Sequence, residues 1–195
     1  MSRREQQRLA TEQEILRAAL RLFGEHGYEA TTTKAIAEAA GVAHGTVFLV
    51  APTKEALLVR ALERRLREEF AARAANLPTR NIEKQLAHVF DGLFDFYSAQ
   101  PALSRVFLRA IVFPTEPIAK AMYEVHVAKL SAYLASLFDA AVERGELTRS
   151  KTAAANVMAI HVYALVSFLN EDGATRETLG KRFRSGLQSL LDGLR

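Results

Sequence analysis

The sequence predicts an all-α fold of about nine helices, and three observations indicate it. Apolar residues recur at the i, i+3, i+4 spacing of a helix through most of the chain, while the alternation typical of strands is rare. Glycine or proline separates most of these stretches, as expected at helix ends. The 195 residues are 49% hydrophobic and 25% charged, which supplies enough apolar side chains for a sizeable core.

Four helices are predicted before a break at residues 76–79. Thr11 can begin the first helix with a capping box, and Gly27 can end it with a positive φ. Thr32 or Thr33 can cap the second helix, which is short. The predicted ranges are about 12–26, 33–40, 43–50 and 53–75.

Five further helices form a larger C-terminal group. Pro101 ends the first of them, which is rich in aromatic residues, and Pro114 and Pro117 separate the second from the third. Ser150 is the expected cap of the fourth. The predicted ranges are about 82–99, 102–112, 117–143, 151–170 and 175–194.

The charge balance permits a polyanionic partner without requiring one. The chain has 26 Lys and Arg against 22 Asp and Glu, a formal net charge of +4. The excess is local at the N-terminus, where Arg3, Arg4 and Arg8 stand against Glu5 alone. This stretch is either a basic arm that reaches a DNA groove or a frayed polar terminus.

Several function classes are disfavoured by what the sequence lacks. The absence of cysteine excludes disulfides and thiolate chemistry and suits a reducing compartment, so we expect a cytoplasmic protein. No apolar run approaches the roughly 20 residues of a membrane span, and we expect no membrane partner. Nucleophile elbows, phosphate-binding glycine loops and paired-histidine metal motifs are also missing. We therefore expect no enzyme activity, no cofactor and no metal.

Residues 36–47 meet the steric requirements of a helix-turn-helix. Ala37 is small where the two helices cross, and Gly41 follows four residues later, where the turn needs a positive φ. Val42 and Val47 can close the small core beneath. An alanine-rich hairpin with a glycine turn has the same pattern, so the motif favours DNA binding without requiring it.

The stretch from residue 15 to residue 58 resembles the DNA-binding domain of the tetracycline-repressor (TetR) family of bacterial transcriptional regulators. The similarity covers under a quarter of the chain but joins several independent motifs in the right order. The matching segments are residues 15–23, 27–32, 36–42, 45–46 and 53–58.

The resemblance implies which parts of the helix-turn-helix contact DNA. The third helix would enter the major groove of a double-stranded DNA operator, and helix N-termini would hold phosphates. Thr32 has an ordinary alternative role as a cap, and His44 as a solvated surface histidine. The DNA-binding residues that the resemblance implies are Thr32, Thr33, Lys34, His44, Gly45, Thr46, Phe48 and Lys54, and the basic N-terminal stretch adds Arg3 and Arg4 as candidates.

Four positions depart from the family pattern. Ala43 stands where a capping serine is usual, Phe48 where a tyrosine is usual, and Val50 and Ala51 where histidine and phenylalanine are usual. The third helix therefore offers few polar groups. Either the protein reaches DNA through its basic arm and apolar contacts with thymine methyls, or it is a helical dimeric interaction module with weak or lost DNA binding.

The C-terminal group predicts a pocket for a small, largely apolar effector of unknown identity. Apolar walls with a few polar tips are typical of such pockets, although the same residues can be plain core. His126 and His161 form a possible polar pair but are too few to indicate a metal. The candidates are Phe90, Phe94, Tyr97, Phe107, Ile111, Met122, Tyr123, His126, Met158 and His161.

The last two helices predict a homodimer. Residues 152–169 are apolar almost all the way round, and the final helix has a seam close to a heptad. An intramolecular core is the alternative. A two-fold dimer would place two recognition helices on a palindromic operator, with half-sites about 34–36 Å apart. The candidate interface residues are Val157, His161, Leu165, Phe168, Leu179, Phe183, Leu187, Leu190 and Leu194.

We therefore expect a ligand-responsive DNA-binding regulator, and the family resemblance implies a repressor released by its effector. Residues 1–52 would form the DNA-binding domain, 53–78 a connecting helix, and 79–195 the ligand-binding and dimerisation domain. The connecting helix would transmit the preference of the effector for one of two states.

Overall fold

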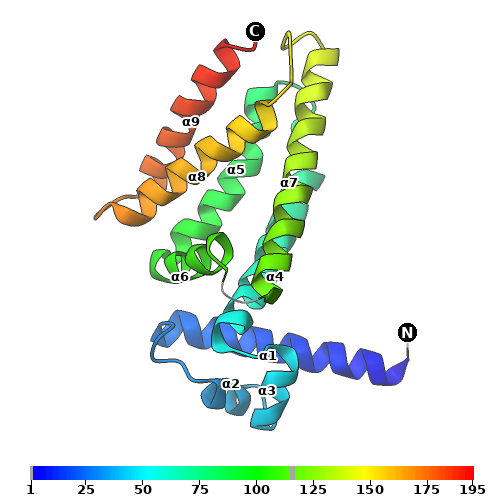
Figure 1. Ribbon diagram of the computed structural model, residues 1–195, viewed down its shortest axis with the longest axis vertical. Coiled ribbons are helices and arrows are strands. Elements are labelled where there is room, and N and C mark those ends of the chain that lie inside the picture. Colours follow the sequence, from blue (N-terminus) through cyan, green and yellow to red (C-terminus); the bar gives the residue numbers. More distant parts are fainter. Residues whose placement is uncertain (1, 115–116) are drawn as a thin grey trace. The chain divides into compact units, whose positions relative to one another are not determined.

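The computed structural model describes residues 2–114 and 117–195, and within them the chain forms nine α-helices and no strand (Figure 1). The predicted all-α fold class is confirmed. The helices are α1 (Arg3–His26), α2 (Thr33–Ala39), α3 (His44–Val50), α4 (Lys54–Ala75), α5 (Ile82–Ala99), α6 (Pro101–Val112), α7 (Pro117–Glu143), α8 (Ala153–Asn170) and α9 (Arg176–Asp192).

Two compact units make up the chain. The first comprises Met1–Arg65 with Ala102–Met122, and the second comprises Leu66–Pro101 with Tyr123–Arg195. Helices α4 and α7 each contribute residues to both units. The domain boundaries drawn from the sequence, at residues 52 and 78, remain a prediction.

The first unit is organised around the apolar face of α1. Ile15, Ala19 and Phe23 recur at helical spacing and are almost fully buried. Thr31, also buried, fixes the turn after α1, because its single hydroxyl proton is shared between the carbonyl of Leu22 at 3.0 Å and that of Gly27 at 2.8 Å. This turn leads the chain into the short helices α2 and α3.

Helix α1 begins about nine residues earlier than the sequence predicts, at Arg3 rather than after Thr11. Ser2 caps it by accepting a hydrogen bond from the Glu5 amide at 3.2 Å, and the Thr11 hydroxyl donates back to the Gln7 carbonyl at 3.0 Å. Residues 3–10 contain mostly strong helix formers and neither glycine nor proline, so the helix continues through them. The predicted basic arm is therefore the first two turns of a helix.

Other helix ends follow the local signals in part. Thr32 caps α2 by accepting from the Ala35 amide at 3.1 Å, which confirms the prediction, and Gly27 ends α1 at φ +81°. Ser150 is not the cap of α8, because Thr152 precedes that helix, at φ +67°.

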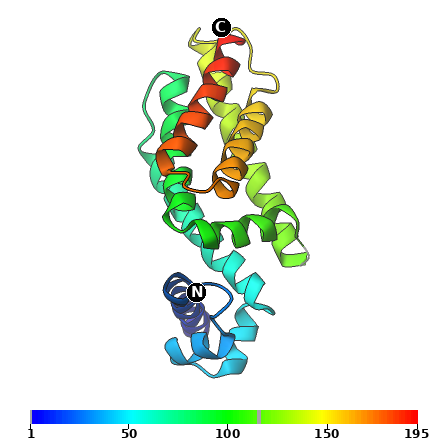
Figure 2. The ribbon, with the colours of Figure 1, turned by 90° about the vertical axis from the view of Figure 1, so that its left-hand side faces the viewer.

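The second unit packs α5, α8 and α9 against one another (Figure 2). Phe90, Phe94 and Phe183 are fully buried at this junction. The N-terminus of α5 is held by Glu146, whose carboxylate accepts from the Ile82 amide at 2.7 Å and the Asn81 amide at 3.2 Å. The Arg144 guanidinium, at 2.7 Å, and these amides lower the pKa of Glu146.

Two segments, Tyr123–Glu143 and Ala153–Asn170, have the length and mean hydropathy of a membrane span, although no apolar run of that length was expected from the sequence. This is weak evidence for a membrane, because core helices of soluble proteins pass the same test. Val157, Ala164 and Leu165 of α8 are indeed buried inside the unit.

Candidate functional site

Helices α2 and α3 form a complete helix-turn-helix (Figure 1). Gly41 makes the turn at φ +66°, where a side chain would be strained. The Val42 amide donates to the Ala37 carbonyl at 3.0 Å, and Val47 is fully buried beneath the turn. The framework of small, glycine and apolar positions thus has the geometry its spacing predicts.

Thr33 and His44 join the first turns of the two helices. The Thr33 hydroxyl lies 3.0 Å from the His44 Nε2 atom, and the His44 ring meets Phe48 edge-on with centroids 5.0 Å apart. His44 and Phe48 are exposed and Thr33 is half-buried. Three of the predicted DNA-binding side chains are therefore one contiguous group rather than separate surface residues.

The outer face of α3 is apolar and open. Leu49 is 85% exposed and Phe48 45% exposed, while Thr46 is half-buried. A Cβ built on Gly45 would meet no atom of the chain within 4 Å, so nothing inside the protein requires glycine there. Leu49 was missed by the sequence analysis, although its position between the buried Val47 and Val50 signals an outward side chain.

Lys54 is engaged by its own chain. Its ammonium donates to the Tyr28 carbonyl at 2.9 Å and the Glu29 carbonyl at 3.2 Å, and it lies 4.4 Å from the centre of the Tyr28 ring. These contacts fasten the start of α4 to the turn between α1 and α2. The remaining implied DNA-binding residues, Arg3, Arg4, Thr32 and Lys34, are all exposed.

His161 of α8 lies among the aromatic rings of the second unit. Its ring centroid is 5.0 Å from that of Phe90, 5.7 Å from Phe94 and 6.2 Å from Tyr97. Burial, with a smaller contribution from His126, lowers the pKa of His161 to about 4, so the ring is neutral at pH 7. Its Nδ1 atom has no hydrogen-bond partner among the described residues.

The predicted effector residues are only partly brought together. Tyr123 is 36% exposed, and Met158 and His126 are half-buried in the same unit as His161. Phe107 and Ile111 belong to the first unit, and the side chain of Met122 lies outside the described residues. Phe183, which the sequence analysis assigned to the dimer interface, joins the aromatic group instead, 4.5 Å from Phe90 between centroids.

The predicted dimer seam is covered by its own subunit. Eight of its nine residues are buried in the single chain, and Leu190 is half-buried. The heptad-like spacing of apolar residues in α9 marks an apolar face of that helix, and this face packs on α5 and α8 of the same unit. The exposed apolar side chains on α8 are different ones, namely Val162, Tyr163 and Val166.

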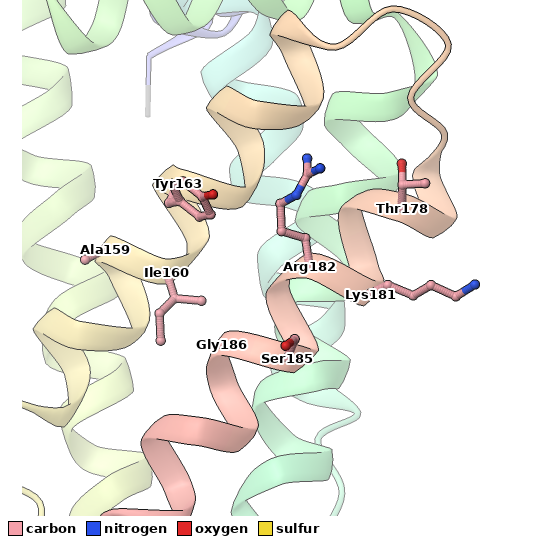
Figure 3. Close-up of a pocket in the computed structure, with 8 residues that line it drawn as sticks. All are labelled: Ala159, Ile160, Tyr163, Thr178, Lys181, Arg182, Ser185 and Gly186. Atoms are coloured by element: carbon pink, nitrogen blue, oxygen red, sulfur yellow. The ribbon is translucent and has the colours of Figure 1, made fainter.

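A groove of about 760 Å³ runs between α8 and α9 beside these exposed residues (Figure 3). The helices approach closely because α9 has Gly186 opposite Ile160, where an added Cβ would lie 2.8 Å from the Ile160 side chain. The Arg182 Nη2 atom is 2.7 Å from Glu171, while Nη1 is buried without a hydrogen-bond partner among the described residues. The groove is lined by Ala159, Ile160, Tyr163, Thr178, Lys181, Arg182, Ser185 and Gly186.

Comparison with known proteins identifies the family. A family model described as bacterial regulatory proteins, tetR family, matches residues 15–61. The HTH-type transcriptional repressor KstR of Rhodococcus jostii is 30% identical over 168 residues, 86% of this chain and 76% of that protein. The KstR of Mycolicibacterium smegmatis is 33% identical over 150 residues, covering 74% and 69%. The chain belongs to the TetR family.

Solved structures share the fold over more than nine-tenths of this chain. Thermus thermophilus FadR, a transcriptional repressor in complex with lauroyl-CoA, has a TM-score of 0.73 and 25% identity, covering 94% of this chain and 95% of that one. Bacillus subtilis FadR, in complex with stearoyl-CoA, has a TM-score of 0.71 at 18% identity, covering 94% and 99%. Because only 18% of the residues are identical, the likeness to Bacillus subtilis FadR shows a shared fold and nothing further.

Membership of the TetR family confirms the prediction of a ligand-responsive DNA-binding regulator. The similar proteins are transcriptional regulators rather than enzymes. Within the described part of the chain, no group of three or more His, Asp and Glu side chains is placed to hold a metal ion.

Proposed function

We propose that the protein is a homodimeric repressor that binds a palindromic DNA operator and is released by an effector with a long apolar part. The observation that carries the proposal is the complete α2–α3 motif, whose outer face is open at Gly45. It acts from the cytoplasm, without enzyme activity, cofactor or membrane partner. Its domains are residues 1–52, a connecting helix over 53–78, and residues 79–195.

The DNA contacts divide into two kinds. The joined pair of Thr33 and His44 presents polar atoms at the first turns of α2 and α3, where Lys34 adds a positive charge. Gly45, Thr46 and Phe48 form the face that enters the major groove, with Phe48 directed at apolar base edges. Thr32 caps α2, and Lys54 positions the turn before it.

The dimer forms on the exposed face of α8. Only 39% of Ala153–Asn170 is buried inside the chain, although this is its most apolar helix. Val162, Tyr163 and Val166 are 42–68% exposed there, and a second copy is the partner that a two-fold operator reader needs. The α8–α9 groove beside Tyr163 receives the same residue of the other subunit.

The effector enters the aromatic group around His161. Rings of Phe90, Phe94 and Tyr97 supply apolar contact, and the neutral His161 supplies one unpartnered polar atom. The structural relative with lauroyl-CoA makes a fatty acyl thioester the class to test first. Because the rings touch one another, the effector has to part them, and this displacement is what it transmits to the DNA-binding unit.

Titration of lauroyl-CoA into a complex of the protein with its selected operator tests the proposal. The expected result is release of the labelled duplex, followed by fluorescence anisotropy, while coenzyme A alone leaves the complex intact. A Phe94→Ala variant that still binds DNA should need a different acyl-CoA concentration for release. Binding of lauroyl-CoA that leaves operator affinity unchanged would remove the effector part of the proposal.

The alternative function is a dimeric interaction module with weak or lost DNA binding. The apolar outer face of α3 favours this alternative. Affinity for duplex DNA measured against salt concentration separates the two functions. A repressor loses affinity steeply as salt rises, whereas an interaction module has little affinity to lose.

A further inference from the structure

The first turns of α1 carry a polar face that the helix-turn-helix alone does not explain. Arg4, Gln7, Arg8 and Thr11 recur at the i, i+3, i+4, i+7 spacing that places side chains on one side of a helix. Arg3, one residue away, is not part of this face. Since the stretch is helical, the orientation of each arginine is fixed rather than averaged over a flexible arm.

This face borders the recognition helix. Thr46, Leu49 and Val50 of α3 lie opposite it, and the two helices enclose a groove of about 390 Å³ within the first unit. Figure 1 shows the N-terminal half of α1 passing beside α3. Leu49, with 85% of its side chain exposed, contributes the apolar wall. We call this space the α1–α3 groove.

The groove carries net positive charge. Arg4 and Arg8 are exposed along it, and the carboxylate among its lining residues is that of Glu12. The Arg60 guanidinium binds that carboxylate at 3.0 Å and also donates to the Val50 carbonyl at the end of α3. Arg60 therefore offsets the charge of Glu12 and fixes the floor of the groove.

We propose that the α1–α3 groove seats one sugar-phosphate strand of the operator, alongside the major groove that α3 enters. Arg4 and Arg8 are separated by a helical rise of about 6 Å, so they meet neighbouring phosphates of one strand. Leu49 packs against the deoxyribose between them. The inference rests on the proposed DNA binding and adds a specific contact surface to it.

The test compares salt dependence of duplex binding in single variants of the full-length protein. Arg4→Ala and Arg8→Ala should each reduce the slope of log affinity against log salt by about 1.8, because the proposed dimer loses one phosphate contact in each of its two subunits. Arg17→Ala is the matched control on the same helix, because Arg17 is exposed and does not line the groove, and it should leave the slope unchanged. Leu49→Ala should weaken binding several-fold at every salt concentration with the slope unaltered.

Two results would overturn the groove as a strand site. Equal losses of slope for Arg17→Ala, Arg4→Ala and Arg8→Ala would show a general effect of positive charge on α1 rather than a strand held in the groove. Unchanged slopes for all three would show that the groove is empty in the complex. A Gly45→Leu variant reports the proposed function separately, because its side chain blocks α3 from the DNA without meeting any atom of the chain within 4 Å at the Cβ position. If wild type and Gly45→Leu bind DNA alike, the proposed function fails as well.

Discussion

At the scale of single residues, Lys54 makes hydrogen bonds within its own chain, so replacing it should affect stability as well as DNA binding. Its ammonium uses two of three possible donors on the carbonyls of Tyr28 and Glu29. Lys54→Ala should therefore lower the free energy of unfolding by about 1.5–3 kcal/mol, the value of hydrogen bonds from a charged group, less where solvent screens them. DNA affinity should fall with the salt slope unchanged.

Denaturant unfolding and salt-dependent DNA binding check this prediction together. Lys34→Ala is the matched control, since Lys34 is exposed on the first turn of α2 and should affect the slope but not the stability. A loss of slope by about 1.8 in Lys54→Ala, one phosphate contact in each subunit of the dimer, would instead assign Lys54 to a phosphate.

His161 should make stability depend on pH. Its folded-state pKa, about 4, lies below its ordinary value of 6.5, so the unfolded chain takes up the proton first as pH falls. Stability from the neutral buried ring is fully present above pH 6.5 and is lost between pH 6.5 and 4, by roughly 3 kcal/mol in all.

Unfolding measured from pH 7.5 to 4 in wild type and His161→Phe isolates this contribution. As pH falls, the free energy of unfolding should decrease more in the wild type than in His161→Phe. Glu146 and Glu177, whose pKa values are lowered, titrate in both proteins, so their contributions cancel in the comparison. Parallel curves would mean that His161 is protonated or solvated in the folded state.

At the scale of secondary-structure elements, the start of α3 lacks a side-chain cap. Ala43 has the extended conformation of a cap residue, φ −64° and ψ 143°, but contributes no side-chain hydrogen bond. Ala43→Ser should add a bond to an amide in the first turn and raise the free energy of unfolding by about 0.5–2 kcal/mol. Thermal unfolding checks it, with Ala39→Ser inside α2 as the control that should not stabilise. An unchanged or lower melting temperature for Ala43→Ser would contradict this assignment.

The same elements show how far sequence alone reaches. The capping of α2 by Thr32 was predictable because an N-cap depends on a residue and its next three neighbours. Thr11 carries the same signal but lies inside α1, since good helix formers upstream and the cap at Ser2 extend the helix past it. Local signals therefore identify possible helix starts, and the neighbouring sequence decides which are used.

Contacts between residues far apart in the chain could not be predicted from local sequence patterns. His44 meets Thr33 across the turn, and Lys54 meets carbonyls 25 and 26 residues before it. The heptad-like seam of α9 was recognised as apolar, but periodicity does not say which surface covers it. Phe183 on that seam packs on Phe90 and Phe94 of the same chain.

At the scale of the whole molecule, the exposed face of α8 should decide the oligomeric state. Tyr163→Glu places a charge where the side chain is 68% exposed, so the subunit should fold but dimerise at least tenfold more weakly. Sedimentation across a concentration series measures this, with Phe113→Glu, 75% exposed and outside α8, as the control. A Tyr163→Glu protein that remains as dimeric as wild type would place the interface elsewhere.

The proposed dimer also determines which operator the protein can bind. Two copies of α3 related by a two-fold axis require a palindrome, and the spacing of its halves follows from the dimer. Tyr163→Glu should thus lose operator affinity without any change in the helix-turn-helix.

Selection of bound fragments from a random duplex pool tests the central claim, DNA recognition by the α2–α3 motif, most directly. The predicted result is enrichment of a palindrome whose half-sites lie about 34–36 Å apart, one helical turn, and no enrichment with Gly45→Leu. Failure of the wild-type protein to enrich any sequence, or the same enrichment by Gly45→Leu, would contradict it.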